Sequence, residues 1–277
     1  MNRRAMWAVA AKDIRATTAN IQVWLPILII PAIFGILMPA GLLIALSLAP
    51  MPSGGNMQSA YDLLNRLPPS ALKRAVDALP HLNQKFAYLL INYLFAPFFL
   101  IIPLMCSSVI SADSFAGEKE RGTLEGLLFA PIDLFSLMAG KALSAFIPAV
   151  VVSLVSFLLY GVTANLAGWG MFHGIFFPQL NWLPLIVLVI PALSLVAILL
   201  TVFISARVSS FQAAYQLGSL TVLPVLLLIF GQITGVLLLS TTVLTVLGLV
   251  ILALDVALLR LLREGLDRGR LFESQIH

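Results

Sequence analysis

The feature that most constrains this chain is a run of 65 residues, 142–206, that contains no Asp, Glu, Lys or Arg. As one helix the run would be about 98 Å long, roughly three times the thickness of the hydrocarbon core of a bilayer. It must therefore turn back on itself. Gly, Asn, Pro and two Trp residues cluster over 165–182, as they do at membrane interfaces, and mark the turn. This run alone predicts two membrane crossings.

The other charge-free runs complete the count of crossings. Residues 208–254 give 47 more positions without charge, about 70 Å as helix, with turn signals at 231–235 and 240–242. Residues 24–48 and 86–110 each suffice for one crossing. The sequence therefore predicts an all-α integral membrane protein with six transmembrane helices. The predicted spans are 24–48, 86–114, 133–165, 183–205, 212–235 and 241–262.

Composition and charge fix the class of protein and its orientation. The chain is 60% hydrophobic and only 10% charged, against about 25% charged residues in soluble domains. With both termini inside, the inner segments hold 12 Lys and Arg and the outer loops hold 4, which predicts a multi-pass plasma-membrane protein with cytoplasmic termini. This bias explains the excess of Lys and Arg, and a nucleic acid partner is not needed to account for it. With one Cys and three scattered His residues, neither a disulfide nor a metal site is expected.

Three segments outside the spans have open interpretations. Residues 1–22 form a pattern typical of an amphipathic helix on the inner membrane surface, with Trp7 as an anchor and Lys12 and Arg15 on the polar side; the alternative is a plain topogenic anchor. Residues 50–85 predict an external helical segment, which either caps a pathway or only connects two spans. Residues 263–277 predict a cytoplasmic tail. A cleaved signal peptide is disfavoured, because the first apolar run is too long.

The most charged stretch lies between the second and third spans. Helix is favoured from about 116 to 130, Pro131 stops it, Asp133 is placed to N-cap the next helix, and Lys141 then falls near the headgroups. Such a helix would carry leucines along one edge beside its charges. The residues concerned are Glu118, Lys119, Glu120, Arg121, Gly122, Thr123, Leu124, Glu125, Leu127 and Leu128. The alternative is an interfacial turn whose charges are simply solvated.

Ionisable residues within the spans are few, which argues against proton pumps, ion symporters and intramembrane proteases. The candidates are Asp113 and Asp255, both near the inner ends of their helices, and with Arg207 they form a possible inner gate. A structural role for Asp255 is the alternative. There is no catalytic grouping and no cofactor motif, and the chain lacks a P-loop, since the pair Gly140 and Lys141 is followed by Ala142.

The stretch "SADSFAGEKERGTLEGLLFAPI" resembles the signature loop of permease subunits of type-2 ATP-binding-cassette exporters. The family pattern, roughly Glu-x-Glu-Arg-Gly-Thr-Leu-Glu-x-Leu-Leu-x-x-Pro, is matched from Glu118 to Pro131. The segments "AAKDIRA" and "SARVSSFQAAYQLGSL" resemble the family's entry helix and its inner turn between the fourth and fifth spans, although Gln212 stands where relatives often have Glu. The helical segment between the first two spans is similar to the sodium-efflux and drug-export branch.

The resemblance implies a type V exporter-like fold and a complex of two kinds of subunit. Two permease chains would form the pathway, and a separate ATPase subunit would bind ATP and Mg²⁺. The helix at 116–130 would be the coupling helix that docks on that ATPase. This chain would then be no enzyme itself. Two alternatives stay open: a membrane scaffold that docks a cytoplasmic partner, and a secondary transporter. The transported substrate is not predicted.

Overall fold

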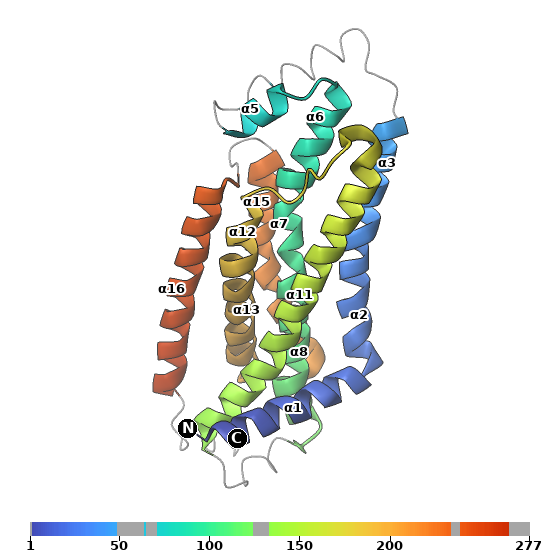
Figure 1. Ribbon diagram of the computed structural model, residues 1–277. Helices are drawn as coiled ribbons and strands as arrows, with labels where there is room; N and C mark the ends of the chain where they lie inside the picture. The colour runs from blue at the N-terminus through green and yellow to red at the C-terminus, as the bar shows by residue number, and fades with distance from the viewer. Residues whose placement is uncertain (1, 49–63, 65–70, 124–132, 234–238, 266–277) are drawn as a thin grey trace.

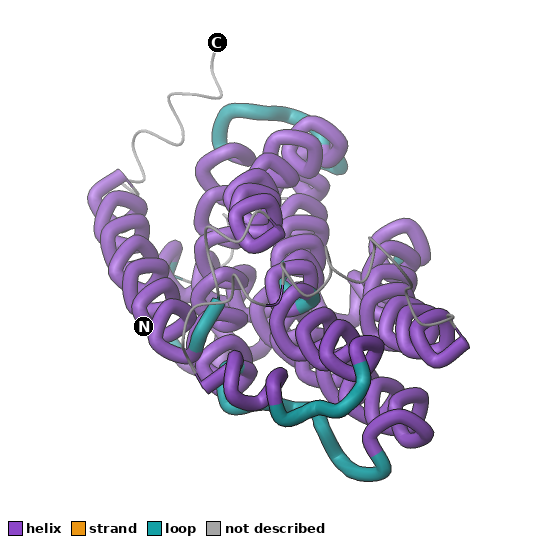
Figure 2. Tube along the Cα trace, turned by 90° about the horizontal axis from the view of Figure 1, so that it is seen from above, coloured by secondary structure: helices purple, strands orange, loops and turns teal. Residues whose placement is uncertain are grey.

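The computed structural model describes residues 2–48, 64, 71–123, 133–233 and 239–265. Over these residues it is helical without any strand, as Figures 1 and 2 show. Six helical stretches are long and apolar enough to cross a membrane, which confirms the predicted class and number of spans. In Figure 1 they run between two ends. We call the end that carries α1 the base and the end that carries α5 the top.

The first half of the chain supplies the helix α1 at the base and the first two spans. Its elements are α1 (Arg3–Ala19), α2 (Ile21–Ala32), η1 (Ile33–Leu37), α3 (Met38–Leu48), α5 (Ala71–Asp77), α6 (Leu82–Leu89), η2 (Leu90–Leu94), α7 (Ala96–Phe99), α8 (Ile101–Ala112), η3 (Asp113–Gly117) and α9 (Glu118–Glu120). Here η1, η2 and η3 are π-helical turns within spans. The second span runs without a break from Leu82 to Glu120.

The second half supplies the other four spans. Its elements are α11 (Leu134–Phe172), α12 (Trp182–Pro184), η4 (Leu185–Val189), α13 (Ile190–Ser205), α14 (Phe211–Gly218), η5 (Ser219–Val222), α15 (Leu223–Ile233) and α16 (Thr241–Gly265). The third span, α11, continues to Phe172, past the predicted end at 165. The turn to the fourth span is therefore shorter than predicted, and it begins at His173 with a left-handed backbone at φ 53°. Residues 50–63 and 266–277, parts of the predicted external segment and tail, lie outside the described residues.

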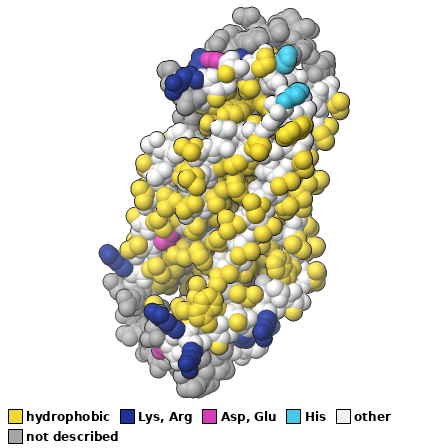
Figure 3. Space-filling view, viewed as in Figure 1, with side chains coloured by type: hydrophobic (Ala, Val, Ile, Leu, Met, Phe, Trp, Pro, Cys, Tyr) yellow, Lys and Arg dark blue, Asp and Glu magenta, His cyan; other side chains and the backbone are white. Residues whose placement is uncertain are grey.

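Apolar side chains cover the middle of the molecule, as a bilayer requires. Figure 3 shows hydrophobic side chains over the middle of the face in view, with Lys and Arg gathered towards the base and the top. Many large apolar residues of the span helices are exposed, such as Leu158, Val187 and Leu227, which are 64%, 65% and 71% exposed. In water this surface would be costly, whereas lipid accepts it.

The kinked second span is held by side chains from its neighbours. Pro97 has no N–H and leaves the carbonyl of Tyr93 without its helical donor, and Gln232 of α15 donates to that carbonyl at 2.7 Å. The π-helical turn η2 similarly frees two carbonyls. Tyr160 donates to the carbonyl of Ile91 at 2.7 Å, and the Trp182 ring N–H donates to that of Asn92 at 3.0 Å. The carbonyls that Pro97 and the π-helical turn leave free are therefore satisfied by tertiary contacts.

Aromatic packing fills the upper half of the bundle between the second, third and fourth spans. The rings of Phe99, Phe157, Tyr160, Phe177 and Trp182 meet mostly edge to face, with centroids 4.8 to 6.5 Å apart. Offset and edge-to-face contacts of this kind add to the stabilisation by burial. This part of the bundle is a packed core, so the centre of a single chain is filled by side chains.

Candidate functional site

The candidate site lies at the base, where α1 packs against the start of α11. The contact is close at Gly140. A Cβ at this position would stand 2.7 Å from the carbonyl oxygen of Met6 and 2.9 Å from the Cβ of Val9. Because only glycine fits there, the backbones of the two helices approach each other directly. This contact fixes where the polar side chains of α1 meet those of the spans.

The inward face of α1 carries a charge, which sequence analysis did not expect. Val9, Ala10, Asp13 and Thr17 are buried, at the spacing of one helical face. Asp13 is therefore turned into the protein between apolar neighbours. Trp7 is 56% exposed, and Lys12 and Arg15 lie on the exposed side as predicted. The placement of α1 on a membrane surface stays a prediction.

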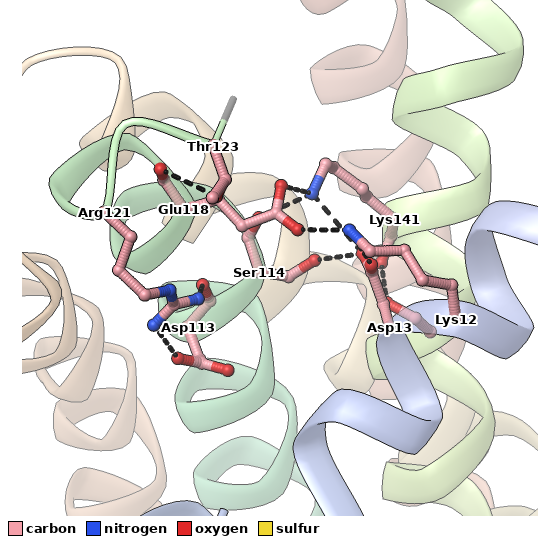
Figure 4. A network of polar contacts seen from close by, with 9 residues as sticks. Lys12, Asp13, Asp113, Ser114, Glu118, Arg121, Thr123 and Lys141 are labelled. Atoms are coloured by element: carbon pink, nitrogen blue, oxygen red, sulfur yellow. Dashed lines mark hydrogen bonds and ion pairs between the residues drawn. The ribbon is translucent and has the colours of Figure 1, made fainter. Parts of the chain in front are cut away.

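Five residues from three segments meet beneath this contact and form what we call the base cluster: Lys12, Asp13, Ser114, Glu118 and Lys141 (Figure 4). Lys141 donates to the carbonyl of Ser114 at 2.7 Å, to Asp13 Oδ2 at 3.3 Å and to Glu118 Oε2. Lys12 donates to Glu118 Oε1 at 2.8 Å, and the Ser114 hydroxyl donates to Asp13 at 2.8 Å. The cluster joins α1, the end of the second span and the start of the third.

The charges of the base cluster balance, but their burial differs. The side chain of Lys141 is fully buried, those of Asp13 and Glu118 are 4% and 9% exposed, and that of Lys12 is 51% exposed. Burial lowers the pKa of Lys12, but the hydrogen bond to Glu118 and the charge of Asp13 more than offset this, so the pKa lies above its ordinary value. Two lysines neutralise two carboxylates, and Lys141 is the partner that water does not reach.

Lys141, which the sequence predicts near the headgroups, is fully buried within the protein. The ammonium group points into the protein because Glu118, Asp13 and the Ser114 carbonyl supply three acceptors there. Glu118 and Lys141 are two further ionisable residues on the helices that carry the spans. The base cluster as a whole was missed. The one signal in the sequence was Asp13, placed on the same helical face as Val9 and Thr17.

Lys119 and Glu120 connect the second span to another part of the base. The Lys119 ammonium donates to the carbonyl of Val208 at 3.2 Å, in the turn between α13 and α14. The Glu120 carboxylate accepts from the backbone N–H of Phe211 at 2.8 Å. Phe211 is the first residue of α14, where free N–H groups and the helix dipole favour a negative charge. The fourth and fifth spans are thus tied to the end of the second.

The Arg121 side chain folds back along its own helix, near the point where that helix ends. Its guanidinium pairs with Asp113 at 3.0 Å, and Gly117 lets the arginine pass, since a Cβ there would stand 2.9 Å from Asp113 Oδ1 and 3.1 Å from the arginine. The next residue, Gly122, has φ 68°, a left-handed conformation that glycine adopts without strain. The second span therefore ends immediately after Arg121, with a glycine at the C-terminal position typical of such endings.

The predicted start of a separate helix at 116 is wrong, because the helix of the second span continues to Glu120. The coupling role of 116–130 stays a prediction. Residues 116–120 are the last turn of the second span, where Glu118 is held by Lys141 and Arg121 pairs back to Asp113. The charges of Glu118, Lys119, Glu120 and Arg121 are all engaged within the chain. Thr123 donates to the carbonyl of Glu118 at 3.2 Å. Leu124, Glu125, Leu127 and Leu128 lie outside the described residues.

The three residues of the possible inner gate are not brought together. Asp113 pairs with Arg121, and Arg207 lies exposed in the turn before α14. Asp255 is buried on α16, with both carboxylate oxygens lacking a hydrogen-bond partner. Within the described ranges no ion pair joins any two of the three. An inner gate built from this set finds no support in the geometry.

The start of α11 is fixed by a side-chain cap, as the sequence predicted. Asp133 accepts from the backbone N–H of Ser136 at 3.0 Å and from its hydroxyl at 2.9 Å. The same hydroxyl accepts from the backbone N–H of Asn2 at 2.9 Å, which holds the start of α1 beside the start of α11. The cap therefore positions both helices that contribute to the base cluster.

The cap leads to a pH-dependent prediction. The Ser136 hydroxyl and amide hold the pKa of the exposed Asp133 carboxyl below its ordinary value. Because this pKa is lower in the folded than in the unfolded chain, its stabilisation is present above the unfolded pKa of about 3.9 and is lost as the pH falls through the folded pKa. We expect Asp133→Ala to be less stable than wild type at neutral pH and equally stable in strong acid, measured by unfolding in detergent.

Asp133→Asn is the matched control for this prediction, since the amide oxygen caps the helix but does not titrate. Its stability relative to Asp133→Ala should not change over the same acidic range. A gap between wild type and Asp133→Ala that stays constant down to about pH 2 would exclude a titrating cap.

The described residues at the base form a junction of helices, and comparison with known families decides what kind of protein carries it. A family model described as an ABC-2 family transporter protein matches residues 7–257, which include the base cluster and nearly all of the six spans. The chain belongs to the ABC-2 transporter family. Searches of curated proteins and of solved structures gave no match. As an ABC-2 transporter the chain is a multi-pass membrane protein, and its family supplies the membrane component of a transporter.

Proposed function

We propose that this ABC-2 protein is the permease subunit of an ATP-driven exporter and is coupled at its base to a separate ATPase subunit that binds ATP and Mg²⁺. The observation that carries the proposal is that Glu118, Lys119 and Glu120 each contact another segment at the base. Arg121 pairs with Asp113 and holds the end of their common helix. A partner that moves the segment after Gly122 would therefore act on several helices at once.

The contacts suggest how such a displacement would spread. Glu118 would carry it to α1 and α11 through Lys12 and Lys141. Lys119 and Glu120 would carry it to the turn that connects the fourth and fifth spans. The Lys141–Glu118 pair has little access to water and is a stiff connection, because breaking it leaves a buried charge unsatisfied. The docking surface itself would then lie in the coupling segment, which the resemblance assigns to 116–130.

The packed interior supports a second permease chain as partner. Aromatic side chains fill the upper half of the bundle, with Tyr160 and Trp182 each 1% exposed. A pathway for cargo must therefore run along an outer face of this chain. Two copies, or this chain and a related one, would enclose such a pathway between them, and we propose that the working unit is a dimer of permease chains with two ATPase subunits.

Co-purification tests the proposal. A tagged chain extracted in mild detergent should bring down a P-loop ATPase, and the ATPase activity of the complex should depend on the permease. Glu120→Ala combined with Arg121→Ala should leave the chain inserted and bound to the ATPase but reduce permease-stimulated hydrolysis about tenfold, within the range of typical coupling free energies. Recovery of no ATPase would contradict the proposal and favour a scaffold.

Arg15→Ala is the matched control for the double variant. Arg15 is an exposed basic residue of α1 at the same end of the molecule. Its removal should leave stimulated hydrolysis unchanged, because a solvated surface charge contributes little. Equal activity in the double variant and in Arg15→Ala would show that the contacts of Glu120 and Arg121 do not transmit the signal.

A further inference from the structure

Asp255 is a buried acidic residue that is not part of the base cluster. It lies on α16 within the sixth membrane-spanning stretch and is 2% exposed. Neither of its carboxylate oxygens has a hydrogen-bond partner. Other buried acids of the chain, Asp13 and Glu118, are each paired with a lysine. A buried carboxylate without partner is costly, because it has lost water and gained nothing in return.

The position of Asp255 on α16 places it in the contact between helices. Leu244, Gly248 and Asp255 are the points of close packing on a single stripe of this helix, at intervals of four and seven residues. At Gly248 the approach is so close that a Cβ would stand 2.6 Å from Leu188. Most other large side chains of α16 are exposed, for example Leu249 and Val250. Asp255 thus occupies a position where an apolar residue would seal the contact.

The helices that face Asp255 offer it no charge. α16 packs against α12, η4 and α13. Residues 182–205, which form these elements, contain no Lys, Arg or His. Two of their hydroxyls are already engaged, since Ser194 donates to the carbonyl of Ile190 and Thr201 to that of Ala197. The nearest basic residue along α16, Arg260, is exposed and lies about 140° around the helix from Asp255.

We propose that Asp255 binds the cationic group of a lipophilic organic cation, which enters between α13 and α16. This inference deepens the proposed function by naming a class of cargo. The carboxylate supplies the single charge, and the apolar walls of the contact suit an apolar body. A metal ion fits less well, because Ca²⁺ and Mg²⁺ need about six oxygen ligands and no group of three His, Cys, Asp or Glu suited to a metal occurs in the described part of the chain.

The attachment of α16 makes such entry feasible. Gly248 holds the helix tightly against η4, seven residues before Asp255. Beyond Asp255 the stripe continues only with half-buried residues, Leu258 and Leu262. The part of α16 nearer the base can therefore separate from α13 while the part nearer the top stays in place. Separation would expose the carboxylate to a ligand that arrives through the lipid.

Direct binding tests the inference without transport. The full chain is placed in phosphatidylcholine nanodiscs, and binding of tetraphenylphosphonium is measured by equilibrium dialysis with empty nanodiscs subtracted. Tetraphenylborate has the same shape and the opposite charge. We expect wild type to bind the phosphonium and not the borate, and Asp255→Asn to bind the phosphonium at least about tenfold more weakly. Asp255→Glu should keep most of the affinity.

Controls separate this inference from misfolding and from the proposed function. Ser194→Ala removes another buried polar group of the same pair of helices and should bind like wild type. Unfolding in detergent should show Asp255→Asn to be at least as stable as wild type, because it removes an unpaired charge. Equal phosphonium binding by wild type and Asp255→Asn, no binding by either, or displacement by Na⁺ at similar concentration would overturn the inference. ATPase co-purification, measured on the same samples, reports on the proposed function alone.

Discussion

Replacing Lys141 with methionine should destabilise the chain by about 3–5 kcal/mol, the usual cost of removing one partner of a buried ion pair. Methionine keeps the length and most of the volume of the side chain and removes the charge. Asp13 and Glu118 would remain at 4% and 9% exposure with only Lys12 to neutralise them. The carbonyl of Ser114 would also lose its donor at 2.7 Å. The free energy of unfolding in mixed micelles measures the effect.

Lys12→Met is the matched control, since Lys12 bonds to the same two carboxylates but is 51% exposed. It should cost about 1 kcal/mol or less. A second comparison isolates the charge. Glu118→Gln introduced into the Lys141→Met variant should recover part of the loss, because it removes a buried charge that has lost its main partner. If Lys141→Met costs no more than Lys12→Met, burial of the pair does not stabilise the base.

Replacing Gly140 with alanine should cost about 1–3 kcal/mol, as overpacking of a close contact usually does. The added Cβ would meet the Met6 carbonyl oxygen at 2.7 Å and the Val9 Cβ at 2.9 Å, and neither backbone can yield without moving α1. Because Asp13 is one turn beyond Val9, the shift would also open the base cluster. Unfolding gives the energy, and acetylation of Lys141 detected by mass spectrometry reports whether the cluster has opened.

Gly170→Ala is the control within the same helix, α11, where an added Cβ meets nothing within 4 Å. Alanine is the better helix former, so this variant should be neutral or more stable by up to about 1 kcal/mol. Acetylation of Lys141 should stay as low as in wild type. Equal stability of the two variants would mean that α1 adjusts to the added methyl group without loss of packing.

For the charged stretch from Glu118 to Arg121, the sequence predicted one part of the structure correctly and missed another. Helical periodicity predicted correctly that these residues are helical, and the motif they belong to pointed to the transporter family that residues 7–257 match. The sequence also suggested that the charges face a partner. In the structure Glu118 contacts α1 and α11 instead, and Lys119 and Glu120 contact the turn before α14 and its first residue. Arg121 pairs with Asp113 of its own helix. The local sequence shows which residues are charged, but it does not show which of those residues become buried in the folded chain.

The sequence by itself determined a helical membrane protein with six spans, because bilayer thickness and the spacing of charges are properties that can be counted along the chain. It also determined the Asp133 cap, which depends on residues three positions apart. Only the tertiary structure decided that Glu118 meets Lys12, 106 residues away, and Lys141. That pairing depends on the approach of α1 to Gly140, and buried charges persist only where packing brings a partner to them.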